Sequence, residues 1–205
     1  MRRTLLALAS VIQVSCALQI GVIAHAESSA DSSLLDTQLQ QSLARDGSFE
    51  SQNLEDFTSQ VLAGNADVTL TTTRAHSGKQ SLQIKGDQAS VEVTQAIAVE
   101  PNTVYEISFW IYTENLVGRG MTGLRVYSDQ YGLLPYVSPT LSPNDGKWHE
   151  FKVYTHTGPA NKLTLSLTFG LWEDKASGTV CYDDLSIRAI ARSKASYPLA
   201  ANRPL

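Results

Sequence analysis

The sequence has few cysteines: its 205 residues include only Cys16 and Cys181. Cys16 lies within a candidate export signal at the N-terminus, so a processed chain would keep one thiol. A single cysteine excludes an intramolecular disulfide and a cysteine-rich zinc site. Cys181 stands in the apolar run Thr179-Val180-Cys181-Tyr182, which is typical of a small core residue rather than of a nucleophile.

Charged residues and the common catalytic motifs are also scarce. Only 18% of residues are charged, and the formal net charge is −4. Nucleic acids and anionic membranes favour a concentrated basic face, so this balance argues against both as partners. The sequence contains no G-x-S-x-G elbow, no H-E-x-x-H and no Walker loop. Glu173/Asp174 and Asp183/Asp184 are adjacent pairs, whose members would point to opposite faces of a strand and would not flank one glycosidic bond. The sequence therefore predicts a protein that is not an enzyme.

No aromatic residue precedes Phe49, and residues 1–26 have a composition of their own. Arg2 and Arg3 precede a mostly apolar run, residues 5–23, which ends at Ala24-His25-Ala26. This order matches a secretory signal peptide with an A-x-A cleavage site. We expect cleavage after Ala26 and a secreted or periplasmic protein with no membrane attachment. The alternative is a lipid on Cys16, which Gln13 three places upstream disfavours.

Period-two alternation of apolar and polar residues dominates from residue 46 to residue 190. It is clearest in residues 162–169, where four apolar residues alternate with Thr164, Ser166 and Thr168. No long amphipathic helix is available for the crossovers of a parallel α/β fold. The sequence predicts an all-β, two-sheet sandwich of the jelly-roll type over residues 46–190. Residues 27–45 form a linker or a short helix in this interpretation, and residues 191–205 a flexible tail.

Five short segments carry a family resemblance. They are Asp46-Gly47-Ser48-Phe49-Glu50, the segment from His76 to Leu82, the segment from Tyr105 to Tyr112, Gly146-Lys147-Trp148-His149 and Tyr182-Asp183-Asp184-Leu185-Ser186. In this order the chain resembles the carbohydrate-binding modules of families four, nine and twenty-two, which are galactose-binding-like β-jelly rolls. The resemblance implies non-catalytic binding of a polysaccharide or oligosaccharide. The same fold serves adhesion and structural roles, so an envelope or matrix protein that binds protein is the alternative.

The resemblance also implies a structural calcium ion. Its ligands would be the side chains of Glu50 and Asp183 and backbone carbonyls near Ser48 and Lys79. Alternation in residues 179–190 places Asp183 on one face with Cys181, Leu185 and Ile187, toward the core, where a carboxylate is costly unless it is hydrogen-bonded or binds a cation. Carboxylate and carbonyl oxygens are the ligands that calcium prefers. The alternative is that Glu50 pairs with Lys79 and Asp183 caps a turn.

Sugars bind through aromatic rings and polar groups, so candidate sugar-binding residues lie on outward strand faces. The resemblance implies one concave sheet as the location, and the outward residues there are Trp110, Tyr112, Arg125, Tyr127, Trp172 and Glu173, with the segment 131–136 as a flank. Each aromatic residue has a structural alternative: Trp110 could lie under a loop, and Trp148 is expected to be a packing residue. A lyase site built from Arg125, Tyr127 and His149 is a further alternative that the sequence does not bring together.

Overall fold

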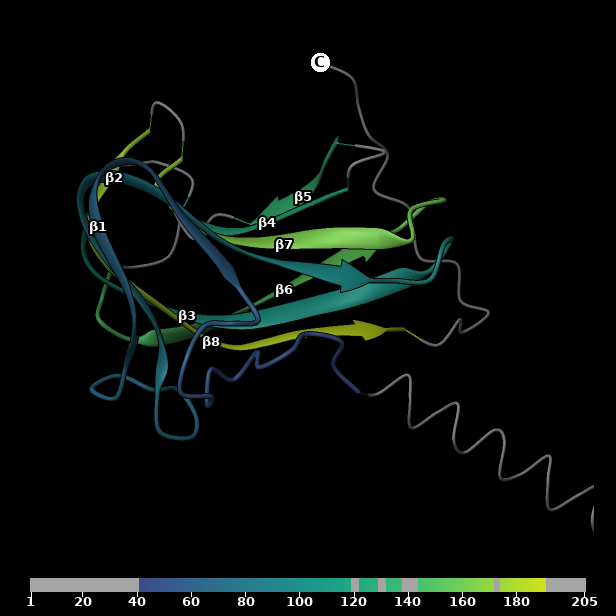
Figure 1. The fold of residues 1–205 in the computed structure, drawn as a ribbon, viewed down its shortest axis with the longest axis horizontal. Coiled ribbons are helices and arrows are strands. Elements are labelled where there is room, and N and C mark those ends of the chain that lie inside the picture. Colours follow the sequence, from purple (N-terminus) through teal and green to yellow (C-terminus); the bar gives the residue numbers. More distant parts are fainter. Residues whose placement is uncertain (1–40, 119–121, 129–131, 138–143, 172–173, 191–205) are drawn as a thin grey trace, which may run out of the picture. The chain divides into compact units, whose positions relative to one another are not determined.

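The computed structural model describes residues 41–118, 122–128, 132–137, 144–171 and 174–190. The expected signal peptide, nearly all of the expected linker and the expected tail lie outside these residues. Within them every regular element is a strand (Figure 1), which confirms the all-β prediction. None of the described residues belongs to a helix that is long and apolar enough to span a membrane.

The strands pair in antiparallel fashion in the order β5-β4-β7-β2-β8-β3-β6, and β1 pairs with β2. Their bounds are β1 Thr58–Thr71, β2 Ser81–Ala98, β3 Val104–Val117, β4 Gly123–Ser128, β5 Gly132–Val137, β6 Trp148–His156, β7 Lys162–Phe169 and β8 Ala176–Ala189.

The long strand β2 divides the sheet into two arms. Its first half, from Leu82, pairs with β8, and its second half, from Val91, pairs with β7. We call β8, β3 and β6 the β3 arm, and β7, β4 and β5 the β4 arm (Figure 1). The change of partner along β2 follows a register shift between Gly86 and Ala89 in its pairing with β8. A Cβ on Gly86 would lie 2.6 Å from the Phe169 ring, so this ring of β7 packs closely against β2 at a residue without a side chain.

Alternate residues of both arms face one core. Leu163, Leu165 and Leu167 of β7 and Ile107 and Phe109 of β3 are buried in the same hydrophobic cluster. The other faces of the two arms therefore point away from this core. The sandwich predicted from alternation is confirmed, and the remaining faces are where a ligand could reach strand residues.

The prediction that Asp183 points toward the core along with Leu185 and Ile187 is wrong. β8 has a bulge opposite β3, since Ser108 pairs with Ser186 whereas Trp110 pairs with Asp183. Asp184 at this bulge has a φ of 50°. The extra residue shifts the alternation, so that Tyr182 as well as Leu185 belongs to the core. Asp183 lies on the outer face and is nevertheless fully buried.

Candidate functional site: the outer face of the β4 arm

Polar residues from three adjacent strands line the outer face of the β4 arm. Arg125 of β4 is opposite Ser166 of β7, which in turn is opposite Thr94 of β2. In the next row Tyr127 is opposite Thr164. The inner face of the same strands is apolar, so strict alternation aims these polar side chains away from the core.

Arg125 is held in place by a carboxylate on β2. Its guanidinium forms an ion pair with Glu92, and the two side chains are only 12% and 15% exposed. Ser166 Oγ donates a second hydrogen bond to Glu92 Oε1, at 3.1 Å. The Arg125 guanidinium also lies over the ring of Tyr127, with its central carbon 5.0 Å from the ring centroid. The result is an arginine, a carboxylate and an aromatic ring that are partly exposed and fixed together, with the fully buried Ser166 beneath them.

Glu92 and Ser166 were not among the residues predicted from the sequence to bind sugar. Glu92 alternates with the core residues Val91 and Val93, which indicates an outward side chain. Its pairing with Arg125 depends on β7 lying between β2 and β4. Strand order of this kind is a tertiary property that the alternation alone does not specify.

The predicted sugar-binding residues do not gather on one face. Trp110 and Tyr112 belong to β3, which is separated from β4 by β7, β2 and β8. The expectation that the aromatic residues lie on neighbouring strands of one sheet is therefore wrong. Trp172, Glu173 and Tyr131 lie outside the described residues. The rest of the predicted flank forms β5, beside β4.

Trp110 and Tyr112 pack against other side chains. The imidazole of His76 stacks on Trp110, with 3.7 Å between ring centroids, and Trp148 approaches both His76 and Tyr112 at 5.8 Å. Tyr112 is only 9% exposed. His76 lies between β1 and β2, so the structural alternatives of Trp110 under a loop and Trp148 in packing are confirmed. Among the remaining candidates, His149 lies on β6, which is not a hydrogen-bonded neighbour of β4, and its Nε2 atom is 3.1 Å from Asp145.

The residues of the predicted calcium site meet at the turn that starts at His76. Asp183 Oδ2 accepts hydrogen bonds from the backbone N–H groups of His76 (2.8 Å) and Ser77 (3.2 Å). Glu50 Oε1 accepts from the N–H groups of Lys79 (2.8 Å) and Gln80 (3.1 Å). Gly78 at the centre of the turn has a φ of 61°, and a Cβ there would lie 2.3 Å from Glu50 Oε1. Both carboxylates thus hold the same turn by its backbone.

Burial and hydrogen bonding shift the two carboxyl groups in opposite directions. Desolvation raises the pKa of Asp183 to about 6, although backbone N–H groups of Ser77, His76 and Asp184 act to lower it. The backbone N–H groups of Lys79 and Gln80 lower the pKa of Glu50. The oxygen chemistry of this pair fits calcium. No three His, Cys, Asp or Glu residues of the described part of the chain group together to hold a metal, so such an ion would depend on backbone carbonyls.

Sequence comparison identifies the family. The family model described as a carbohydrate-binding domain, of families 4 and 9, matches residues 41–176. The chain belongs to this carbohydrate-binding domain family. The resemblance predicted from the five short segments is thereby confirmed. A comparison with curated protein sequences finds no match.

Solved structures with the same fold include other carbohydrate-binding modules. TmCBM61, solved with β-1,4-galactotriose, has a TM-score of 0.53 and 16% identity, over 74% of this chain and 100% of that one. The CBM22-1 xylan-binding domain of Paenibacillus barcinonensis Xyn10C has a TM-score of 0.51 and 20% identity, over 72% and 94%. The enzymatically active domain of bacteriophage CBA120 tailspike protein 4 has a TM-score of 0.53 and 14% identity; the alignment covers 73% of this chain but 21% of the tailspike. The TM-scores show a shared fold, and at these low identities the comparison shows the fold alone.

A glycine motif between β3 and β4 does not mark a dinucleotide-binding site. Residues 118–123 have the spacing G-x-G-x-x-G of dinucleotide-binding loops. In this domain the segment connects β3 to β4, which belong to antiparallel pairs. A dinucleotide site needs a strand followed directly by a helix N-terminus, and β4 follows instead.

Proposed function

We propose that this carbohydrate-binding domain binds polysaccharide on the outer face of the β4 arm, around Arg125 and Tyr127. The observation that carries the proposal is the fixed group of Arg125, Glu92, Ser166 and Tyr127. An aromatic ring can stack on a sugar, while guanidinium and carboxylate groups can bond its hydroxyls; the buried Ser166 supports Glu92 from below. Because the ion pair fixes Arg125 beforehand, binding would cost little side-chain entropy.

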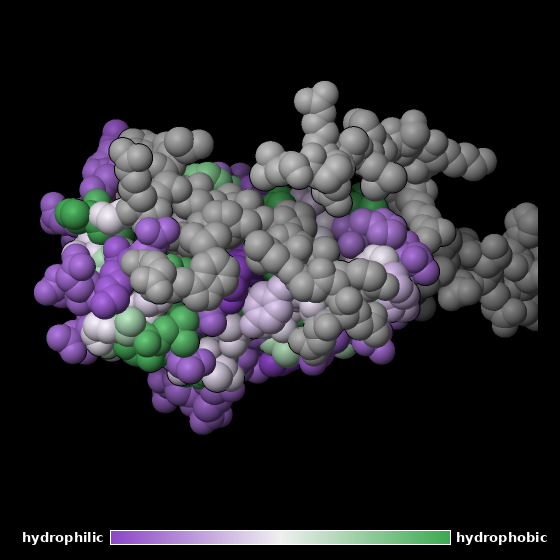
Figure 2. Space-filling view, turned by 90° about the horizontal axis from the view of Figure 1, so that it is seen from above, coloured by the Kyte–Doolittle hydropathy of each residue, from purple (hydrophilic) through white to green (hydrophobic). Residues whose placement is uncertain are grey.

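The visible surface on this side of the domain is mixed in hydropathy. Figure 2 looks from above onto the side of the domain where β4, β5 and β7 lie in Figure 1. Around the grey atoms, hydrophilic and intermediate residues predominate, and hydrophobic residues form small separate areas. Membership of the carbohydrate-binding domain family supports polysaccharide over the protein-interaction alternative.

The proposal includes a non-catalytic, exported protein. The absence of nucleophile and metalloprotease motifs from the sequence supports binding without catalysis. The signal-like residues 1–26 support export. We further propose a structural calcium ion at Glu50 and Asp183. The proposal is supported by the meeting of these two carboxylates at one turn and by the preference of calcium for carboxylate oxygens.

Affinity electrophoresis tests the function directly. The protein is run through gels that contain soluble xylan, β-glucan, mannan, galactan or alginate, with calcium present. We expect one polymer to retard it and Tyr127→Ala to weaken the retardation by about tenfold, while the variant keeps the melting temperature of the parent. Leu62→Ala, an exposed change on β1, is the control. A folded protein that no polymer retards would support the protein-binding alternative instead.

A further inference from the structure

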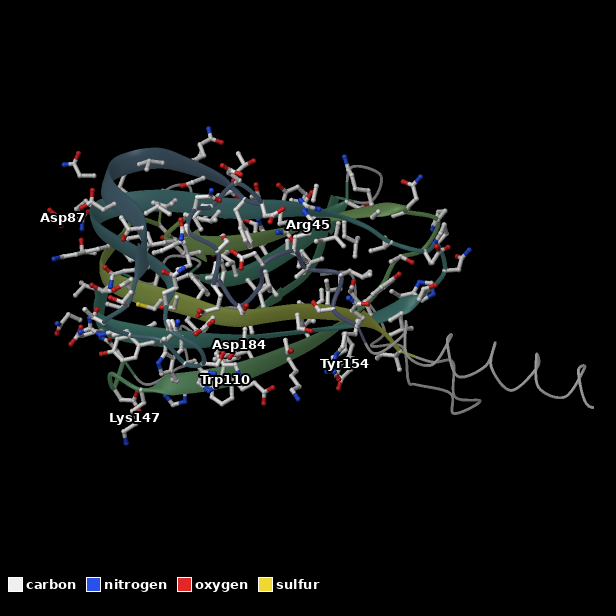
Figure 3. The ribbon with its side chains drawn as sticks, turned by 60° about the horizontal axis from the view of Figure 1, so that its bottom comes forward. Arg45, Asp87, Trp110, Lys147, Tyr154 and Asp184 are labelled. Carbon is white, nitrogen blue, oxygen red and sulfur yellow. The ribbon has the colours of Figure 1, made fainter. Side chains whose placement is uncertain are left out.

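The outer face of the β3 arm carries an exposed aromatic ring that the proposed function does not use. Tyr154 of β6 is 54% exposed, and it is the only aromatic residue among the large exposed hydrophobic side chains of the described residues. In Figure 3 it lies on the same side of the ribbon as Trp110, along β6. Like the Arg125 face, this face points away from the core, but it belongs to the other arm of the sheet.

The Tyr154 ring is fixed by its neighbours across the sheet. Its hydroxyl donates to Glu106 Oε2 at 2.9 Å, and Arg188 Nη2 donates to Glu106 Oε1 at 2.8 Å. These two hydrogen bonds, with that of Tyr154 the larger cause, lower the pKa of Glu106 and so favour its ionised form. Tyr154, Glu106 and Arg188 occupy one row across β6, β3 and β8. An exposed ring with a fixed hydroxyl loses little freedom when a ligand stacks on it.

Polar groups continue from this ring along the same face. The next row contains Lys152, Ser108 and Ser186, and the row after it contains Glu150 beside Trp110. Lys152 Nζ and Glu150 Oε1 are 3.1 Å apart at the surface. Four residues of strand separate Tyr154 from Glu150, a length of about 13 Å. Both donors and acceptors therefore line a path that begins at an exposed aromatic ring.

We propose that this face is a second glycan-binding surface, with Tyr154 as its stacking platform and Lys152, Ser108 and Glu150 as hydrogen-bonding groups. The class of ligand rests on the proposed function, but the surface is separate from the Arg125 site. The balance of charges, with Lys152 and Arg188 beside Glu150 and Glu106, suits a neutral sugar chain. Two separate binding faces on different arms would make one domain bivalent and able to link two polysaccharide chains.

The test compares Tyr127→Ala, Tyr154→Ala and the double variant with the parent protein. The probe is whichever soluble polymer retards the parent, starting with xylan and β-1,4-galactan. Retardation in gels measures total binding, and dynamic light scattering of protein–polymer mixtures measures the linking of chains. We expect Tyr154→Ala to keep most of the retardation. The increase in light scattering on mixing with polymer should be about three- to tenfold smaller than that of the parent. Tyr127→Ala should keep a weak residual retardation that the double variant loses.

Tyr154→Phe distinguishes a role of the Tyr154 ring in stacking on sugar from a role of its hydroxyl in holding Glu106. It keeps the ring and removes the hydrogen bond to Glu106, so we expect chain linking to persist. Melting temperatures of all variants show whether the fold is intact. Unchanged chain linking by a folded Tyr154→Ala protein overturns the second surface while leaving the Arg125 site standing. If no polymer retards the parent, both proposals fail.

Discussion

The imidazole of His76 stacks on the indole of Trp110, with ring centroids 3.7 Å apart and planes 14° from parallel. His76 Nδ1 lies 2.6 Å from Asp184 Oδ2, so the histidine is held from both sides. The segment between β1 and β2 is thereby attached to the outer face of the β3 arm. One face of the only tryptophan on β3 is used for this contact, which indicates a packing role for Trp110.

We predict that Trp110→Ala lowers stability and leaves sugar binding unchanged. The substitution removes the surface on which His76 stacks, and we expect a loss of about 2–3 kcal/mol in the free energy of unfolding, because the tryptophan is only partly buried. Urea denaturation measures the loss, and affinity electrophoresis at a temperature where the variant is folded measures binding. A folded Trp110→Ala protein with weakened retardation would place sugar at this residue instead.

Most strands were predictable from the sequence, but β1, β5 and the order of the strands were not. Leu163, Leu165 and Leu167 alternate with hydroxyl residues, and the structure buries these leucines as predicted. Alternation says which face a residue occupies within its own strand. It does not say which strands are neighbours, so Trp110 and Tyr127 were assigned to one sheet although four strand-to-strand steps separate β3 from β4.

Asp183 shows a second limit of sequence reasoning. Counting by twos along β8 is valid only where the strand is regular, and the bulge at Asp184 adds one residue to the count. Bulges leave a weak signal in sequence, because asparagine and aspartate tolerate a positive φ but also occur elsewhere. Glu50 and Asp183 nevertheless meet at one turn, as the family resemblance implied.

The ion pair of Arg125 and Glu92 should contribute measurably to stability. Both side chains are largely buried, so Glu92→Gln leaves a poorly solvated positive charge. We expect the free energy of unfolding to fall by about 1–3 kcal/mol. The matched control is Asp56→Asn, which removes the partner of Arg45 in a pair whose side chains are 56% and 41% exposed. Its effect should be below about 1 kcal/mol. Equal effects in urea denaturation would contradict the argument from burial.

Removal of calcium should lower the melting temperature. If the ion is bound at a concentration about a hundredfold above its dissociation constant, it adds about 2.7 kcal/mol to stability. For a domain of this size that corresponds to roughly 5–10 °C. Differential scanning fluorimetry with excess chelator, then with calcium restored, measures the shift. Glu50→Gln should have a low melting temperature that no longer responds to chelator, whereas Asp56→Asn should respond like the parent. A metal-stripped parent protein whose melting temperature is insensitive to both additions would count against calcium.

In the presence of chelator, Asp183 should make the protein more stable as the pH falls. This is the opposite of the effect of a carboxylate whose pKa is lowered by folding. Burial raises the pKa of this carboxyl from 3.8 to about 6 in the folded state. Between these values the folded state binds more protons than the unfolded state, so lowering the pH stabilises the fold and raising it destabilises the fold. The contribution is on the order of 2–3 kcal/mol between about pH 4 and pH 7.

Asp183→Asn isolates this contribution from that of the other carboxylates. Asp183 accepts hydrogen bonds from three backbone N–H groups, and the asparagine replaces one of its two acceptor oxygens with an NH₂ group. The overall stability of the variant should therefore be lower. The informative quantity is the difference in unfolding free energy between the parent and the variant, measured by urea denaturation at several pH values. This difference should grow in favour of the parent as the pH falls from 7 to 5. A difference that stays constant would show that the buried carboxylate ionises at its ordinary pKa.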